Sequence, residues 1–401
     1  MDHPLHDSRY SWFRLAASLL IGLIGNVGMW SIVLILPDVQ AEFAVDRGTA
    51  SLPYTLTMIG FALGNLLIGR AVDRWGMTAS LIGAALILGG GFSLAALAPS
   101  VAVLALVQLL IGFGSGAAFG PLIADVSHWF LKRRGIAVAV AASGNYLSGA
   151  LWPLILSPVL AAWDWRQAYL GLAGVVVVSL VPLSFLLTRR MTEEGAAHAA
   201  ASRPAMATGL PTPVLILLLC LAGIGCCVAM SMPQVHIVAL CVDLGYGAAA
   251  GANMLSLMLF GGVVSRLASG FLADRLGGIR TLLIGSGLQG MALFLYLPFD
   301  GLATLNVVSL VFGLSQGGIV PSYAVIVREY LPAREAGKHV GLVISTTILG
   351  MALGGWMSGY IFDLTGSYQM AVLNGIGWNV LNIGIMLLIL QRSRPRGAVA
   401  A

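Results

Sequence analysis

Long apolar stretches separated by short polar breaks dominate this chain. Each is long enough for a membrane-crossing helix, which needs about 20 mostly apolar residues. Strands are not expected, because a barrel shows short alternating segments. The pattern predicts an all-α membrane protein with twelve transmembrane helices, at residues 12–36, 49–69, 78–98, 101–123, 135–160, 166–187, 213–242, 249–271, 278–299, 302–326, 338–360 and 368–391.

Composition supports a membrane setting. Of the 401 residues, 58% are hydrophobic and 9% are charged, whereas a soluble protein is about 25% charged. With so little charge the exterior cannot face water, so the bilayer must cover most of it. The first apolar stretch is too long for a signal peptide and lacks a clear cleavage site, so we expect it to be retained as the first span.

The placement of the basic residues predicts the orientation. With the N-terminus inside, Arg47 and Arg166 lie outside and Arg266 lies within a span, which leaves 18 of the 21 basic residues on the cytoplasmic side. This asymmetry predicts a multi-pass protein of the cytoplasmic (inner) membrane with both termini cytoplasmic. Anionic lipid headgroups account for the basic residues, so no nucleic acid partner is expected.

The residues indicate no cofactor, metal or catalytic centre. The four cysteines all fall in the seventh predicted span, which does not indicate a disulfide framework or a zinc site. No Walker-type loop is present, which disfavours an ATP-driven pump. A membrane enzyme would need a paired acid, base or metal cluster, and none is found. We therefore expect a protein that is not an enzyme and that has no cofactor.

A weak internal repeat divides the chain. The segment Gly69–Gly76 matches Gly270–Gly277, and the segment Gly112–Gly116 matches Gly313–Gly317. The repeat predicts two pseudo-symmetric six-helix bundles, residues 1–187 and 213–401, joined by a polar cytoplasmic linker, residues 188–212. Many transporters have this plan, with the site between two halves that rock about it.

The repeated segments resemble a signature of the major facilitator superfamily, G-x-x-x-D-R-x-G between spans two and three, with a degenerate copy between spans eight and nine. The resemblance covers essentially the whole chain and implies the major facilitator fold. It also implies that Asp73, Arg74, Asp274 and Arg275 make gating contacts that close the cytoplasmic side and break during the transport cycle. The alternative is a static loop that only fixes topology.

Small residues recur every four positions in two predicted spans. Gly112, Gly116 and Gly120 do so in the fourth, and two pairs do so in the eleventh: Gly350 with Gly354, and Gly355 with Gly359. This spacing permits close helix contact. Static packing explains this spacing. Sliding contact between the halves is implied only by the family resemblance.

Arg266 is the candidate substrate-binding residue, because it is a charge within the eighth span. A charge at this depth usually faces a cavity or a partner, although it could also extend to the inner interface. No acidic residue lies near the middle of any span. An unpaired guanidinium in a wet cavity can bind a carboxylate through two parallel hydrogen bonds, so an anionic substrate is expected.

Other polar residues fall within the predicted spans. His236 follows Pro233 in the seventh and could carry a proton, or simply bond to a neighbouring helix. Five more occupy spans one, five and ten, which usually line the cavity in this fold. Each could donate to a substrate oxygen or bridge two helices; they are Asn26, Asn145, Tyr146, Gln316 and Tyr323.

The segment Asp125–Ala137 resembles the monocarboxylate transporter branch and its oxalate–formate antiporter relatives, with an aromatic residue and a basic triplet before span five. The resemblance implies that Arg266, followed by Gly270, anchors a carboxylate. The sequence departs from the branch at Gly262, where animal members often have Asp. Span eleven also lacks the second cation of oxalate-type relatives, and one internal arginine suits a monoanion.

The sequence therefore predicts a secondary active transporter that moves a small monocarboxylate, such as a lactate- or pyruvate-like anion, with a proton by alternating access. His236 or the substrate would carry the proton. The expected partners are this anion, the proton and the lipid bilayer, and we expect a monomer. An organic-anion antiporter or a drug exporter is the alternative within transport. A membrane sensor is the other alternative, although both tails are short for an output domain.

Overall fold

The computed structural model describes residues 6–131, 133–189 and 206–395. The first half of the chain forms α1 (Arg9–Gly25), α2 (Val27–Leu34), α3 (Leu36–Phe43), α4 (Arg47–Ala50), α5 (Leu52–Trp75), α6 (Met77–Ala96), α7 (Val101–Gly116), α8 (Gly120–Trp129), α9 (Arg134–Ala162), α10 (Trp165–Ser184) and the 3-10 turn η1 (Phe185–Leu187). The second half forms β1 (Met206–Ala207), α12 (Thr212–Asp243), α13 (Ala248–Leu276), α14 (Gly278–Leu295), α15 (Leu302–Gln316), α16 (Ile319–Tyr330), α17 (Ala333–Thr365), α18 (Tyr368–Arg392) and β2 (Arg394–Pro395). The short strands β1 and β2 pair antiparallel.

The prediction of twelve spans is confirmed. Within the described residues, twelve helical stretches are long and apolar enough to cross a membrane. Four of them are broken into two helices, α1 with α2, α4 with α5, α7 with α8, and α15 with α16, which the hydrophobic pattern did not indicate. Residues 190–205 of the predicted linker and Lys132 of the branch segment lie outside the described residues, so the domain boundaries stay a prediction.

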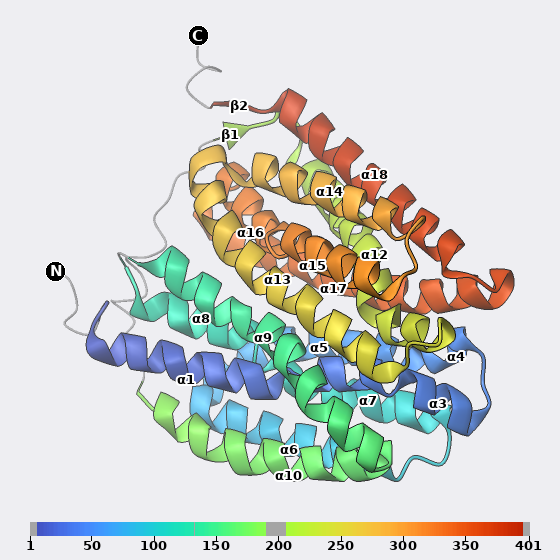
Figure 1. Ribbon diagram of the computed structural model, residues 1–401. Coiled ribbons are helices and arrows are strands. Elements are labelled where there is room, and N and C mark those ends of the chain that lie inside the picture. Colours follow the sequence, from blue (N-terminus) through green and yellow to red (C-terminus); the bar gives the residue numbers. More distant parts are fainter. Residues whose placement is uncertain (1–5, 132, 190–205, 396–401) are drawn as a thin grey trace.

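The two six-helix bundles lie side by side. In Figure 1 the helices of the first half, coloured blue to green, fill the lower part, and those of the second half, yellow to red, fill the upper part. The bundles meet along α9 with α13 and along α5 with α17. Helix α1 begins and α18 ends towards the left of the view, which we call the terminal end. Helices α3 and α4 lie at the opposite, far end.

Glycines let the helices within each bundle touch through their backbones. A Cβ added at Gly112 of α7 would lie 1.9 Å from the carbonyl oxygen of Thr57 on α5. In the second bundle, a Cβ added at Gly313 of α15 would lie 2.0 Å from the carbonyl oxygen of Met258 on α13. These positions leave no room for any side chain. The predicted close contact is confirmed, and the repeat in sequence is a repeat in packing.

Helix α17 carries its two glycine pairs on different faces. Cβ atoms added at Gly350 and Gly354 would meet α12 of the same bundle, at 2.7 Å from backbone atoms of Ile224 and Val228. A Cβ added at Gly359 would instead lie 2.8 Å from the carbonyl oxygen of Arg47, in the other bundle. One stripe therefore packs α17 into its own half, and the other brings it against the opposite half.

At the far end, α3 is held against the first bundle by a small polar cluster. The Glu42 carboxylate accepts hydrogen bonds from Arg166 Nη2 at 2.6 Å and from Trp165 Nε1 at 2.6 Å. Burial alone would raise the pKa of Glu42, but the hydrogen bonds from Arg166 and Trp165 outweigh it and lower the pKa below its ordinary value. The ionised carboxylate is therefore the form that the folded protein favours.

This cluster predicts acid sensitivity with a defined sign. Because the pKa of Glu42 is lowered on folding, its contribution to stability is present at neutral pH and is lost as the pH falls through the folded pKa. We expect Glu42→Gln to lower the melting temperature in detergent at about pH 7 but to match the native protein at about pH 3. The effect is modest, because the pair is largely exposed. An equal deficit at both pH values would contradict the prediction.

Candidate functional site

Arg266 lies where the two bundles meet. The Arg266 side chain is buried, with 6% of the residue exposed. Nε donates a hydrogen bond to the Gly317 carbonyl oxygen of its own bundle at 3.1 Å, and Nη1 donates to the Ala142 carbonyl oxygen on α9 at 2.6 Å. The guanidinium carbon lies 4.1 Å from the centre of the Tyr146 ring, also on α9. Gly262 lies beside that ring, and a Cβ added there would make an ordinary contact with it at 3.5 Å.

Among the described residues, no carboxylate forms an ion pair with Arg266. The ion pairs found there involve three other arginines and are Arg14–Asp125, Arg47–Asp243 and Arg166–Glu42. The expected aqueous vestibule is not open around Arg266 in this conformation, because two backbone carbonyls and an aromatic face surround the charge. Nor does the side chain extend to lipid headgroups. The guanidinium can therefore supply a strong site for an anion that reaches it.

Of the other predicted polar residues, Tyr146 is the one that contacts Arg266. Gln316 precedes Gly317, and its Oε1 accepts a hydrogen bond from Gln234 Nε2 at 2.7 Å. This leaves Gln316 Nε2 and Gln234 Oε1 buried without a hydrogen-bond partner. Tyr323 donates to Asn382 Oδ1 at 2.9 Å within the second bundle.

Two predicted residues bridge helices of the first bundle. Asn26, at the break between α1 and α2, donates to the carbonyl oxygens of Gly22 at 2.7 Å and Ala118 at 3.2 Å. Asn145 Oδ1 accepts from Trp30 Nε1 at 3.1 Å. Both residues bridge helices in this conformation, which the sequence analysis gave as the alternative to binding a substrate oxygen.

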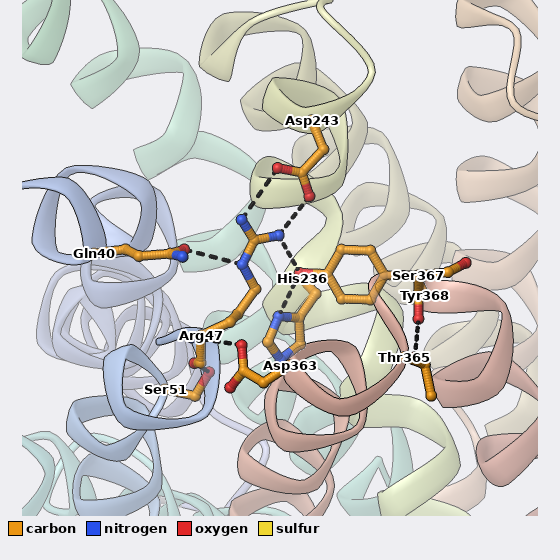
Figure 2. A network of polar contacts seen from close by, with 9 residues as sticks. All are labelled: Gln40, Arg47, Ser51, His236, Asp243, Asp363, Thr365, Ser367 and Tyr368. Carbon is orange, nitrogen blue, oxygen red and sulfur yellow. Dashed lines mark hydrogen bonds and ion pairs between the residues drawn. The ribbon is translucent and has the colours of Figure 1, made fainter. Parts of the chain in front are cut away.

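His236 belongs to a different site, at the far end. Its Nδ1 lies 3.0 Å from the Tyr368 hydroxyl oxygen, and its Nε2 lies 2.8 Å from the Gly355 carbonyl oxygen. The Tyr368 hydroxyl in turn accepts a hydrogen bond from Arg47 Nη1 at 2.9 Å. The three side chains form one chain of contacts from the second bundle to the first (Figure 2).

Arg47 is the centre of this network. Its Nη1 and Nη2 donate to the two carboxylate oxygens of Asp243, at 2.5 and 3.1 Å, and its Nε donates to Gln40 Oε1 at 2.9 Å. Asp363 accepts from the backbone N–H groups of Arg47 at 2.9 Å and Gly48 at 2.6 Å, at the start of α4. Asp243, Asp363 and Tyr368 all belong to the second bundle, so these contacts hold the two bundles together (Figure 2).

Comparison with known sequences decides the family. The profile of the Major Facilitator Superfamily matches residues 18–355 and 217–400. The chain belongs to this superfamily. Its members are transporters, so the protein is a multi-pass membrane transporter, and the resemblance seen in the signature loops is confirmed.

The relatives place this superfamily member near the monocarboxylate transporters. The chain is 26% identical to monocarboxylate transporter 13 of Rattus norvegicus, over 98% of this chain and 94% of that one. It is 27% identical to monocarboxylate transporter 11 of Homo sapiens, over 97% and 84%. The agnestins efflux protein of Paecilomyces divaricatus is 23% identical, over 88% and 80%.

Solved structures agree on the fold. A bacterial homologue of the human lysosomal transporter Spinster, in an inward-facing and occupied conformation, superposes with a TM-score of 0.69 at 13% identity, over 96% of this chain and 97% of that one. The human organic anion transporter MFSD10 gives a TM-score of 0.69 at 15% identity, over 93% and 99%. The predicted major facilitator fold is confirmed.

The superfamily signature residues are exposed in this conformation. Asp73 and Arg74 lie near the end of α5, and Asp274 and Arg275 lie near the end of α13. Within the described residues no ion pair joins them to the opposite bundle, and the Arg74 guanidinium lies 5.9 Å from the Trp75 ring of its own loop. The gating role of these four residues stays a prediction, while Arg47 and its partners join the two bundles at the far end.

The far-end network around Arg47 was not predicted from the sequence. One signal was present: Arg47 is a basic residue on the side that the charge distribution otherwise leaves poor in cations, and Asp243 ends the seventh span. Two opposite charges at helix ends on one side of the membrane are candidates for an ion pair. Nothing in the sequence indicated that Tyr368 links Arg47 to His236.

Proposed function

We propose that this superfamily member moves a small monocarboxylate across the cytoplasmic membrane together with a proton, by alternating access, with Arg266 binding the carboxylate. The observation that carries the proposal is the position of Arg266, buried between the bundles with no acid beside it. The other buried arginines of the described residues, Arg14 and Arg47, are each paired with an aspartate, and one unpaired buried cation favours a monoanion over a dianion. Similarity to monocarboxylate transporters 11 and 13 supports this substrate class.

The contacts of Arg266 give a physical link between substrate and conformation. Its Nη1 is now bonded to the Ala142 carbonyl oxygen of the first bundle. A carboxylate is charged and accepts two parallel N–H groups, so it competes well with a backbone carbonyl for the guanidinium. When the carboxylate replaces Ala142, one contact between the bundles is exchanged for a contact with the substrate, which changes how firmly the bundles are joined.

The two ends of the molecule support alternating access. The far end is closed by Arg47 and its partners, whereas the signature residues at the terminal end are exposed. With both termini in the cytoplasm, as the basic residues predict, the far end is the outer side. The conformation is then one with a closed outer gate.

An organic-anion antiporter or exporter is the second candidate. Similarity to the agnestins efflux protein favours it, because that protein is named for export. The two candidates differ in what drives net movement of the substrate. A proton gradient drives the symporter, whereas a gradient of a second anion drives the antiporter.

Uptake by proteoliposomes tests the proposal. We expect labelled lactate or pyruvate to accumulate when the outer solution is acidic, and to accumulate much less after the pH gradient is collapsed with an ionophore. A dicarboxylate and a cationic dye serve as competitors, and neither should slow uptake. Movement that needs an anion on the opposite side, and ignores the pH gradient, would instead establish the antiporter.

A further inference from the structure

The hydrogen bonds around His236 fix its protonation state. Nε2 lies 2.8 Å from the Gly355 carbonyl oxygen, and a carbonyl can only accept, so Nε2 carries the hydrogen. Nδ1 lies 3.0 Å from the Tyr368 hydroxyl, which could donate or accept. The role of Tyr368 therefore decides whether Nδ1 is bare or protonated.

Arg47 settles the direction of the Tyr368 hydroxyl. Arg47 Nη1 lies 2.9 Å from the Tyr368 oxygen and can only donate. When the hydroxyl oxygen accepts this bond and directs its own hydrogen to Nδ1 of His236, every donor in this chain of contacts has an acceptor. This arrangement leaves Nδ1 bare and His236 neutral in the closed gate.

The neighbouring carboxylates are engaged by other groups, and neither is hydrogen-bonded to the His236 ring. The Asp243 carboxylate binds Arg47 with both oxygens, and Asp363 binds the backbone N–H groups at the start of α4 with both of its own. A proton on Nδ1 would make the Tyr368 oxygen accept from two cations and would turn its hydroxyl hydrogen away from His236. The titratable and charged groups around His236 are Arg47, Asp243, Asp363, Tyr368 and, across Gly355, Tyr54.

We propose that His236 is the pH sensor of the far-end gate: it is neutral while the gate is closed, and its protonation releases Arg47 from Tyr368 and Asp243. The residue is buried, so the proton reaches it when the gate opens briefly and then holds the gate open. His236 must lose this proton for the gate to close. His236 therefore does not carry the transported proton, and acid on the outer side favours the outward-open state, an assignment of sides that rests on the proposed function.

A distance measurement across the gate tests this sensor. Spin labels are placed at two exposed far-end positions, Ala44→Cys in the first bundle and Gln369→Cys in the second, in a Cys220→Ala background; the other native cysteines are buried. The distance between the labels is followed by pulsed EPR in lipid nanodiscs, without substrate, from about pH 8 to about pH 5. We expect a short distance at high pH and a growing longer component as the pH falls.

Three variants decide the outcome. His236→Gln is neutral at every pH and should keep the short distance throughout, whereas Asp243→Asn removes the partner of Arg47 and should give the long distance at every pH. Tyr368→Phe breaks the link to His236 and should remove the pH dependence, while Tyr360→Phe, an exposed tyrosine on α17, should behave as the native protein. If His236→Gln opens at the same pH as the native protein, or if Asp243→Asn stays closed, the proposal is wrong.

Transport assays separate this proposal from the proposed function. The label distances need no substrate, so a failure to transport monocarboxylates would leave the gate result intact. Conversely, His236→Gln should take up monocarboxylate more slowly, because its outer gate opens less often, but its uptake should still respond to a pH gradient. If the variant still exchanges substrate but no longer responds to the gradient, His236 carries the transported proton and the sensor assignment fails.

Discussion

Replacing Arg266 with Lys should reduce monocarboxylate uptake by roughly 30-fold to several thousand-fold, because removing one partner of a buried charge-assisted pair costs about 2–5 kcal/mol. Lysine keeps the positive charge but cannot offer two parallel N–H groups to a carboxylate. It also cannot bond to the carbonyl oxygens of Gly317 and Ala142 with the same geometry. The loss should therefore appear even though the charge is retained.

The matched control for this change is Arg166→Lys. Arg166 pairs with Glu42 at the far end, partly exposed and away from the bundle interface, so its replacement should leave uptake within a factor of about two to three. Initial rates in proteoliposomes, normalised to the amount of folded protein from size-exclusion chromatography, give the comparison. Equal uptake by Arg266→Lys and the native protein would remove Arg266 as the carboxylate site.

Replacing Gly112 with Ala should prevent accumulation of folded protein. The added Cβ would lie 1.9 Å from the Thr57 carbonyl oxygen, and the atom it meets is backbone, which cannot move aside as a flexible side chain would. The helices α5 and α7 would have to separate along their contact, with loss of the packing between them. The same substitution at Gly313 should have the same effect, because it meets Met258 in the equivalent way.

Gly90 on α6 and Gly287 on α14 supply the controls. A Cβ at either position has no atom within 4 Å, and alanine favours a helix interior over glycine by roughly 0.5–1 kcal/mol. Gly90→Ala and Gly287→Ala should therefore fold as well as the native protein or slightly better. Thermal unfolding and the monodisperse fraction in detergent separate the two groups, and indistinguishable behaviour of Gly112→Ala and Gly90→Ala would refute the packing argument.

The fold could be predicted because each of its signals is local. A span needs only its own run of apolar residues, and the close contact at Gly112 is visible as a four-residue spacing. Arg266 could be found for a similar reason, since a cation within an apolar run is rare. The breaks within spans could not be predicted, because the residues at the breaks, such as Asn26, lie in stretches that are apolar on average.

The far-end gate could not be predicted because it depends on which conformation the bundles adopt. Arg47 and Asp243 are 196 positions apart, and they meet only when the bundles close at that end. The role of His236 depends on Tyr368 and Gly355, which are contributed by two further helices. The burial of Arg266 has the same origin, since its contact with Ala142 comes from the opposite bundle.

The two glycine faces of α17 differ in how long their contacts last. The face at Gly350 and Gly354 packs on α12 and travels with it as one body, so a bulkier residue there changes whether the protein folds. The face at Gly359 packs on Arg47, and in the proposed alternating-access cycle this contact must part each time the far end opens. A bulkier residue on this second face would leave the fold intact and alter the fraction of time spent facing each side of the membrane. One helix thus allows thermodynamic stability and transport rate to be adjusted independently.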